Sequence, residues 1–294
     1  MLVPMKAILD AAHRGRYGVP ALPGFNEIQI RAAIEAASEA RSPLVLLTSN
    51  GGDPVFTHGI AKYFADKSDV SVALCLDHSP SFDDCVAGIR TGVTAIMVDR
   101  SKLPYDRNAE EVRELAKIAR AAGVSVEAEL GHVGSGMNYA VDGINALTEP
   151  GPAAAFIEET GIDALAVAVG TAHGVYSGTP HIDFARLAEI DAACGKPLVL
   201  HGGSGSGDAN ISKACTMGIA KVNIVTDVLA SAYRASTAGD YSGNGIHRFF
   251  PAIFKAIRES ALRAFEVTGS VGKMVYSGRG GGGASGAASS LVEV

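Results

Sequence analysis

Three histidines stand where apolar, β-rich stretches of the sequence give way to polar residues. His78 ends the stretch VSVALCLDH, His173 lies in GTAHG after another such stretch, and His201 ends the core of KPLVLHG. One imidazole in such a place is commonly a hydrogen-bonded loop residue, but three at separate strand ends indicate a shared site. Zinc with an open coordination position is the first choice of ligand, because imidazole favours zinc over magnesium.

Carboxylates accompany these histidines. Asp77 directly precedes His78, and Glu127 and Glu129 lie in the β-rich stretch VSVEAELG. A carboxylate next in sequence to a metal ligand can move a proton at a reacting oxygen of the substrate. The pattern therefore predicts acid/base chemistry at Asp77, beside a metal site that a carboxylate from the fifth stretch completes.

A glycine-rich segment, HGGSGSG at 201–207, precedes the stretch KVNIVTD at 221–227. Glycines allow backbone amides to turn toward an anion, and phosphate sites of α/β barrels commonly follow the seventh and eighth strands. A plain turn is the alternative interpretation, and the segment matches neither the dinucleotide fingerprint nor a Walker loop. A metal beside a phosphate site predicts a phosphorylated ketone or ketose as substrate, because a metal can polarise its carbonyl group.

Eight β-rich stretches alternate with helix-like segments, and this pattern predicts a parallel sheet. The count favours a closed (β/α)₈ TIM barrel with extra C-terminal helices, and a doubly wound open sheet is the alternative. In a barrel the carboxyl ends of all strands share one face. The predicted strands are 19–26, 43–50, 70–78, 93–99, 124–131, 162–170, 196–202 and 219–227.

The remaining segments define the expected domain limits. In the helix predicted at 108–123, Asn108 can cap the start and Gly123 can end it. A long helical segment after the eighth strand runs to about Ser270. We expect one barrel domain at 1–278, including this helical segment, and a flexible glycine- and serine-rich tail at 279–294.

Composition limits the possible environments and partners. The chain has 294 residues, 47% of them hydrophobic, and a net charge of −6 without a charged block, which argues against a nucleic-acid surface. The start resembles no signal peptide and no apolar run reaches the roughly 20 residues of a membrane helix, so we expect a cytoplasmic protein without a membrane partner. Four scattered cysteines without a CxxC pair are expected to be reduced thiols: Cys75, Cys85, Cys194 and Cys215.

Together these motifs resemble those of the class II, zinc-dependent ketose-bisphosphate aldolases, nearest the fructose- and tagatose-bisphosphate branch. The shared motifs keep the family order over about residues 5–230. They are GFN, SNGG, LDH, EAELG, VGTAHG, LVLHGGSG and KVNIVTD. The resemblance implies Zn²⁺ as cofactor, a sugar phosphate as small-molecule substrate and a homo-oligomer, either a dimer or a tetramer.

The resemblance also implies a role for individual residues. His78, His173 and His201 would bind catalytic zinc, and Glu129 matches a glutamate that ligates the metal in an alternative position. Asp77 would be the acid/base at the hydroxyl of the aldehyde half. Residues matched to binding of the dihydroxyacetone phosphate half are Gly174, Gly202, Ser204, Asn223 and Thr226. Asn26 and Ser49 match the wall of the substrate pocket, and Arg248 matches an arginine that reaches a second phosphate in a neighbouring subunit.

One loop departs from the family pattern. The family follows EAELG with a GGxED loop whose glutamate carries the proton at C3 of the donor, but Met137 and Asn138 stand there in this sequence. Asp142 is a candidate replacement. Val225 replaces an aspartate found in some fructose-bisphosphate enzymes, which weakens that substrate assignment.

These departures leave three functions open. The first is a zinc aldolase that cleaves a phosphorylated ketose into dihydroxyacetone phosphate and an aldehyde. The second is a zinc aldolase or lyase that acts on another sugar phosphate. A sugar-phosphate-binding relative without turnover is disfavoured, because Asp77 and all three histidines remain.

Overall fold

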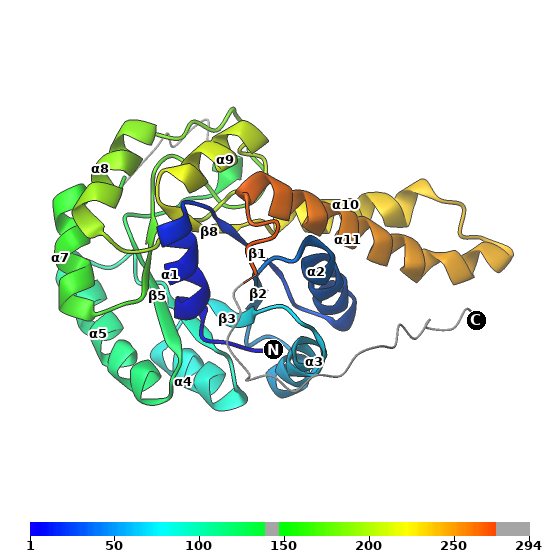
Figure 1. Cartoon of the computed structure of the whole chain (residues 1–294), viewed down its shortest axis with the longest axis horizontal. Helices are drawn as coiled ribbons and strands as arrows, with labels where there is room; N and C mark the ends of the chain where they lie inside the picture. The colour runs from blue at the N-terminus through cyan, green and yellow to red at the C-terminus, as the bar shows by residue number, and fades with distance from the viewer. Residues whose placement is uncertain (139–146, 275–294) are drawn as a thin grey trace.

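Eight parallel strands close into a barrel in which each strand pairs with the next and β8 pairs with β1 (Figure 1). The computed structural model describes residues 1–138 and 147–274. Each predicted stretch contains one strand, so the TIM-barrel prediction is confirmed and the open-sheet alternative is wrong. The strands are β1 (Val19–Pro23), β2 (Leu44–Thr48), β3 (Val72–Ser79), β4 (Ala95–Val98), β5 (Ser125–Leu130), β6 (Ala164–Val167), β7 (Leu198–Leu200) and β8 (Ile219–Asn223).

The strands supply two cores, because successive side chains of a strand point to opposite faces. In β2, Leu44 and Leu46 pack with the surrounding helices, whereas Val45 and Leu47 fill the barrel interior. Both faces are therefore buried, which explains why the strands read as continuous apolar runs. In β5, Val126 and Ala128 belong to the outer core, so the intervening glutamates point into the barrel.

Helices surround the barrel, and α1 (Met5–Gly15) closes its amino-terminal end. This helix packs against β1, β3, β5 and β8, and the backbone amide of Lys6 donates to Ser125 Oγ at 2.9 Å. The open end is therefore the carboxyl-terminal one. The other barrel helices are α2 (Glu27–Ala40), α3 (Pro54–Lys67), α4 (Phe82–Thr91), α5 (Tyr105–Ala121), α7 (Pro150–Thr160), α8 (Phe184–Cys194) and α9 (Asp208–Thr216).

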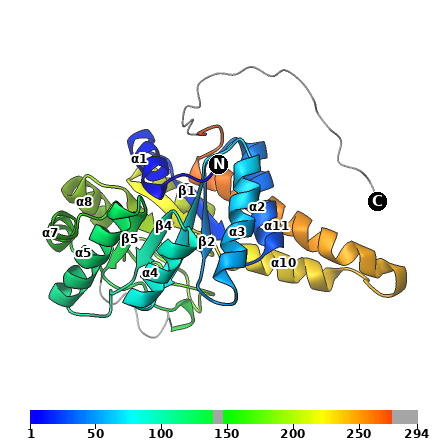
Figure 2. The same ribbon diagram turned by 90° about the horizontal axis from the view of Figure 1, so that it is seen from below.

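The last two helices form an arm that projects away from the barrel (Figures 1 and 2). It consists of α10 (Thr226–Ala238), the short 3₁₀ helix η2 (Gly243–Arg248) and α11 (Phe249–Thr268). The carboxyl-terminal part of α11 is anchored by Phe265, which is fully buried in the outer core. Tyr233, Ile246 and Phe250 are more than half exposed on the arm.

The helix cap predicted at Asn108 differs from the one in the structure. The helix predicted at 108–123 begins at Tyr105 after Pro104, so the proposed cap at Asn108 is wrong. The Asn108 side chain is instead buried and donates from Nδ2 to the backbone carbonyl of Glu129 at 3.0 Å, which fixes the end of β5.

Asp142 and the tail 279–294 lie outside the described residues. In the part of the chain that the structure describes, no helix has the length and apolar character needed to cross a membrane.

Candidate metal centre and active site

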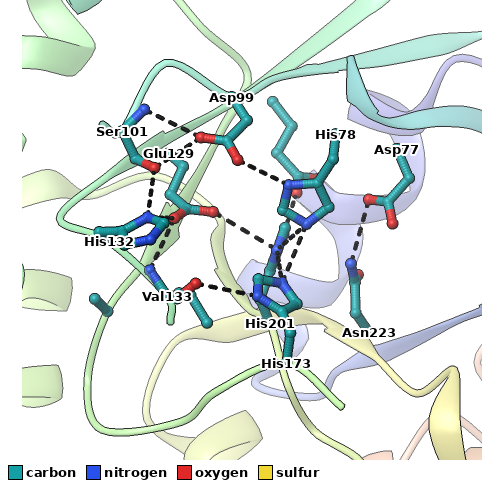
Figure 3. A network of polar contacts seen from close by, with 12 residues as sticks. Asp77, His78, Asp99, Ser101, Glu129, His132, Val133, His173, His201 and Asn223 are labelled. Carbon is teal, nitrogen blue, oxygen red and sulfur yellow. Dashed lines mark hydrogen bonds and ion pairs between the residues drawn. The ribbon is translucent and has the colours of Figure 1, made fainter. Parts of the chain in front are cut away.

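The ends of β3, β6 and β7 bring His78, His173 and His201 together (Figure 3). Nε2 of His78 lies 3.1 Å from Nε2 of His173 and 3.0 Å from Nδ1 of His201, and the last two atoms are 3.2 Å apart. One nitrogen of each ring therefore faces the same point. We call these residues the histidine trio.

The second nitrogen of each ring faces an oxygen that accepts a hydrogen bond. The contacts are 3.0 Å from His78 Nδ1 to Asp99 Oδ2, 3.1 Å from His173 Nδ1 to the Val133 carbonyl oxygen, and 2.9 Å from His201 Nε2 to Glu127 Oε1. A neutral imidazole carries one N–H, and these outer contacts place it on the outer nitrogen. In their neutral forms, the three rings then direct unprotonated inward nitrogens at one another.

This donor set fits a divalent metal ion. Two zinc–nitrogen bonds of about 2.0–2.1 Å at a tetrahedral angle place their nitrogens about 3.3 Å apart, close to the spacing in the trio. Burial, together with the neighbouring His201 and His78, lowers the pKa of His173 to about 4, which favours its neutral, ligating form. Hydrogen-bonded outer nitrogens are typical of metal-ligating histidines.

A strained backbone directs the first ring of the trio. His78 has a φ of 42°, in the left-handed region that non-glycine residues rarely adopt, and the pairing register of β3 with β4 shifts next to it. Asp99 holds the ring, and Ser101 donates to Asp99 Oδ1 from its amide at 3.0 Å and its hydroxyl at 2.7 Å. Burial opposes charge on both groups, but their mutual hydrogen bond lowers the pKa of Asp99 and raises the pKa of His78 to about 9.

Glu129 lies beside the trio with one free oxygen. Its Oε1 accepts from the Val133 amide at 2.9 Å, while Oε2 lies 3.7 Å from His201 Nδ1 and has no hydrogen-bond partner among residues 1–138 and 147–274. Burial raises the pKa of this carboxyl, but hydrogen bonding to His132 and the charge of His201 lower it overall. The orphaned oxygen suits an alternative ligand position, and His78, Asp99 and Glu129 form a second group of potential ligand atoms within 4.8 Å.

Asp77, the predicted acid/base, lies on the other side of His78 (Figure 3). It is half-buried, and its Oδ1 accepts from Asn223 Nδ2 at 3.4 Å. Asn223 is 6% exposed at the end of β8, and its Oδ1 has no hydrogen-bond partner within the described ranges. The structure therefore brings one predicted catalytic and one predicted substrate-binding residue to the edge of the trio.

The glycine-rich segment after β7 packs tightly against the loop after β6. Gly202 has a φ of +65°, and a Cβ there would lie 2.1 Å from the Ala172 carbonyl oxygen, so a larger residue does not fit. The Tyr176 hydroxyl donates to the Gly202 carbonyl and accepts from the Ala172 amide, both at 2.8 Å. Ser204 is 4% exposed, and its Oγ accepts from the Asp227 amide in the first turn of α10 at 3.1 Å. The loop and the amino end of α10 thus adjoin, as in helix-terminal anion sites.

The other predicted binding residues have mixed positions. Gly174 directly follows His173 in the sequence and has a φ of +85°, and Thr226 is the first residue of α10. Asn26 caps α2 by accepting from the Gln29 amide at 3.0 Å, and Ser49 Oγ accepts from the Gly51 amide at 3.4 Å. Arg248 lies in the arm, on η2, and no contact described for this chain joins it to the trio.

The loop after β5, whose sequence departs from the family pattern, is hydrogen-bonded to His173 of the trio. The Gly136 amide donates to the His173 carbonyl at 2.7 Å, and the His173 amide donates to the Gly134 carbonyl at 2.8 Å. Met137 lies in the 3₁₀ helix η1 (Gly136–Asn138) and is 74% exposed. A side chain without an exchangeable proton therefore stands at the position where the resemblance implies a proton carrier.

A charge pair inside the barrel supports His201. Lys221 and Glu127 are fully buried, and Lys221 Nζ lies 3.0 Å from Glu127 Oε1 and 2.8 Å from Oε2. Burial raises the pKa of Glu127, but the Lys221 ammonium and His201 outweigh it and lower that pKa to about 2. The Glu127 charge raises the pKa of Lys221 against the effect of burial. Both groups are therefore charged at neutral pH.

Several supporting residues were not predicted from the sequence as part of the site. Asp99 and Lys221 carried a usable signal, because a charge inside or at the end of an apolar stretch is unusual. Val133 acts through its backbone, so its side chain gives no signal. The residues in question are Asp99, Ser101, His132, Val133, Tyr176 and Lys221.

Comparisons with known proteins identify the family of the chain. Residues 3–273 match the model of the family described as fructose-bisphosphate aldolase class-II. The YdjI aldolase of Escherichia coli K12 is 30% identical, with a TM-score of 0.85 over 94% of this chain and 100% of that one. A fructose-bisphosphate aldolase of Campylobacter jejuni, 23% identical, shares the fold with a TM-score of 0.74 over 92% and 97% of the two chains. The chain therefore belongs to the class II fructose-bisphosphate aldolase family and is an aldolase, a lyase that breaks carbon–carbon bonds.

Proposed function

We propose that this aldolase is zinc-dependent and reversibly cleaves a phosphorylated ketose, of the fructose- or tagatose-bisphosphate type, into dihydroxyacetone phosphate and an aldehyde. The convergence of three inward-facing imidazole nitrogens beside a glycine-rich loop carries the proposal. Bound zinc would polarise the ketose carbonyl and stabilise negative charge on its oxygen. His78, His173 and His201 would hold the ion, with Glu129 as the alternative ligand.

Asp77 would handle the proton of the aldehyde half. As the carbon–carbon bond breaks, the hydroxyl of the departing half becomes a carbonyl, and its proton needs an acceptor. Asp77 is half-buried beside His78, and the Asn223 amide orients its carboxylate. In the synthetic direction the same carboxyl would return the proton to the new hydroxyl.

The loop from Gly202 to Ser204, with Gly174, Asn223 and Thr226, would bind the dihydroxyacetone phosphate half. The support is the close fit of Gly202 under Ala172 and the adjoining amino end of α10. Backbone amides at such a helix end favour a phosphate dianion. Asn26 and Ser49 would line the remaining pocket from the ends of β1 and β2.

A homo-oligomer, a dimer or a tetramer, is part of the proposal. The projecting arm leaves Tyr233, Ile246 and Phe250 more than half exposed, as expected for a surface that a neighbouring subunit covers. Arg248 on this arm would then serve the neighbouring subunit's substrate. A cytoplasmic location is likewise proposed: all four cysteines lie in the described ranges and are free thiols, as in a reducing compartment.

Met137 favours a second candidate, an aldolase or lyase for a different sugar phosphate. A thioether cannot carry the donor-side proton, and the loop that bears it contacts His173. Turnover with a panel of ketose phosphates, measured with added zinc and after chelation, separates the candidates. Cleavage of fructose or tagatose bisphosphate supports the first, cleavage of another member supports the second, and binding without turnover contradicts both.

His173→Ala should remove most of the bound zinc and the aldolase activity, because one of three ligands is lost. Elemental analysis of the purified variant checks the metal, and His181→Ala, an exposed histidine later in the same loop between β6 and α8, is the control that keeps it. Stoichiometric zinc in the His173→Ala protein would contradict the assignment.

Asp77→Ala should retain zinc and lower kcat by a factor of about 10²–10⁴, as expected when a positioned acid/base is lost. Asp69→Ala, in the exposed turn that precedes the same strand, serves as the matched control and should keep kcat. The carboxylate has another role if the Asp77→Ala protein loses its metal. The same conclusion follows if this protein keeps the kcat of the unmodified enzyme.

Gly202→Ala should weaken binding of phosphorylated substrate at least about tenfold, because the added Cβ displaces the loop from Ala172. The ratio of KM values for a phosphorylated and a phosphate-free ketose measures the effect. Gly151→Ala, where a Cβ meets no atom within 4 Å, is the control. An unchanged ratio would rule out a phosphate site at this loop.

Met137→Glu should speed exchange of the C3 proton of dihydroxyacetone phosphate, which we expect to be slow in the unmodified enzyme. Exchange of that proton with solvent deuterium, followed by NMR, provides the measurement. Met137→Gln has similar size but no ionisable group and should not change the rate. If the unmodified enzyme already exchanges this proton as fast as it cleaves ketose, another residue is the carrier.

A further inference from the structure

His201 presents a different nitrogen to the trio from the other two rings. Its inward atom is Nδ1, whereas His78 and His173 turn Nε2 inward. Its proton must therefore lie on Nε2, at the far end of a ring that is fully buried. A buried N–H without an acceptor is strongly unfavourable, so the position of this proton depends on the hydrogen-bond acceptor next to Nε2.

Glu127 contacts Nε2 of His201, and the contact with Lys221 restricts Glu127 to accepting hydrogen bonds. Glu127 Oε1 is 2.9 Å from His201 Nε2, and Lys221 Nζ contacts both Glu127 oxygens at 3.0 and 2.8 Å. An ammonium group can only donate hydrogen bonds, so its contact with both oxygens favours the ionised carboxylate. An ionised carboxylate can only accept, so Glu127 accepts from the His201 ring. The three residues come from β5, from β8 and from the end of β7, and all are fully buried.

The placement of this pair is unusual for a barrel interior. Most of the other interior positions carry apolar residues such as Val45, Ala73 and Val199. Replacing a buried ion pair by apolar residues is often neutral or stabilising, so stability alone does not account for it. Lys221 contacts Glu127, and Glu127 in turn contacts the proposed ligand His201.

We propose that Glu127 and Lys221 are positioning residues that hold the His201 proton on Nε2 and so keep the Nδ1 lone pair directed at the metal. This inference rests on the metal centre proposed above. The corresponding proton of His78 is held by Asp99, whose second oxygen is tied by Ser101, and that of His173 by a backbone carbonyl. Among the three outer acceptors, Glu127 is the one that is paired with a buried cation.

Metal titration of the chelator-treated full chain tests the proposal. Co²⁺ is the probe, since its visible absorption reports tetrahedral binding. Glu127→Leu combined with Lys221→Met removes the acceptor and its counter-ion together and leaves no unpaired charge. We expect the double variant to fold and to bind Co²⁺ about 10–100-fold more weakly. Glu127→Gln with Lys221→Met keeps an accepting oxygen and should recover part of this loss.

A second readout separates positioning from a merely structural role. In ¹⁵N-labelled metal-free protein, NMR should find the His201 proton on Nε2 in the unmodified chain and on either nitrogen in the leucine variant. Asp191→Asn breaks an ion pair with Arg16 that lies away from the trio, and it should change neither Co²⁺ affinity nor this tautomer.

The outcomes are distinct. If the unmodified chain binds no Co²⁺, the metal centre and this inference both fail. If it binds one ion, His173→Ala loses it, and both double variants bind as tightly as the unmodified chain, the metal centre stands and the positioning role is wrong. Should the leucine variant not fold, full affinity and an unchanged tautomer in the glutamine variant would equally overturn the role.

Discussion

Three imidazole nitrogens within 3.2 Å of one another are the arrangement on which the rest of the site depends. It persists only if each ring keeps its proton on the outer side, and the fold provides three different acceptors for this purpose. One is a carboxylate after β4, one is a backbone carbonyl of the loop after β5, and one is a carboxylate inside the barrel. Each acceptor is itself held by further contacts, so the geometry of the centre is set well beyond the three histidines.

The residues of the site are divided between the strand ends of the barrel and the loops that follow them. Strand ends carry the histidines, Asp77 and Asn223, and the apolar layers beneath them are fully buried. The loops after β5, β6 and β7 carry the residues that would meet the substrate. In such a barrel a loop can change without moving a strand, so residues on the loops can vary separately from those on the strands.

The sequence was sufficient to predict the fold and the membership of the trio, because both depend on local patterns. Apolar runs of strand length marked all eight strands, and each histidine stood at the end of one. The residues that hold the trio in place were harder to predict from the sequence. Glu127 and Lys221 are 94 residues apart, so nothing local couples them, and Val133 contributes a backbone carbonyl. Asn108 was misread as a cap because Pro104 starts the helix one turn earlier, which frees the asparagine side chain to hold β5.

The loop after β5 has backbone hydrogen bonds to His173 on both sides, through Gly134 and Gly136. An insertion or deletion in this loop would therefore transmit a displacement directly to one corner of the trio. The length of this loop and the position of His173 are therefore coupled. A change in one of the two facing segments would require a matching change in the other, because two backbone hydrogen bonds join them.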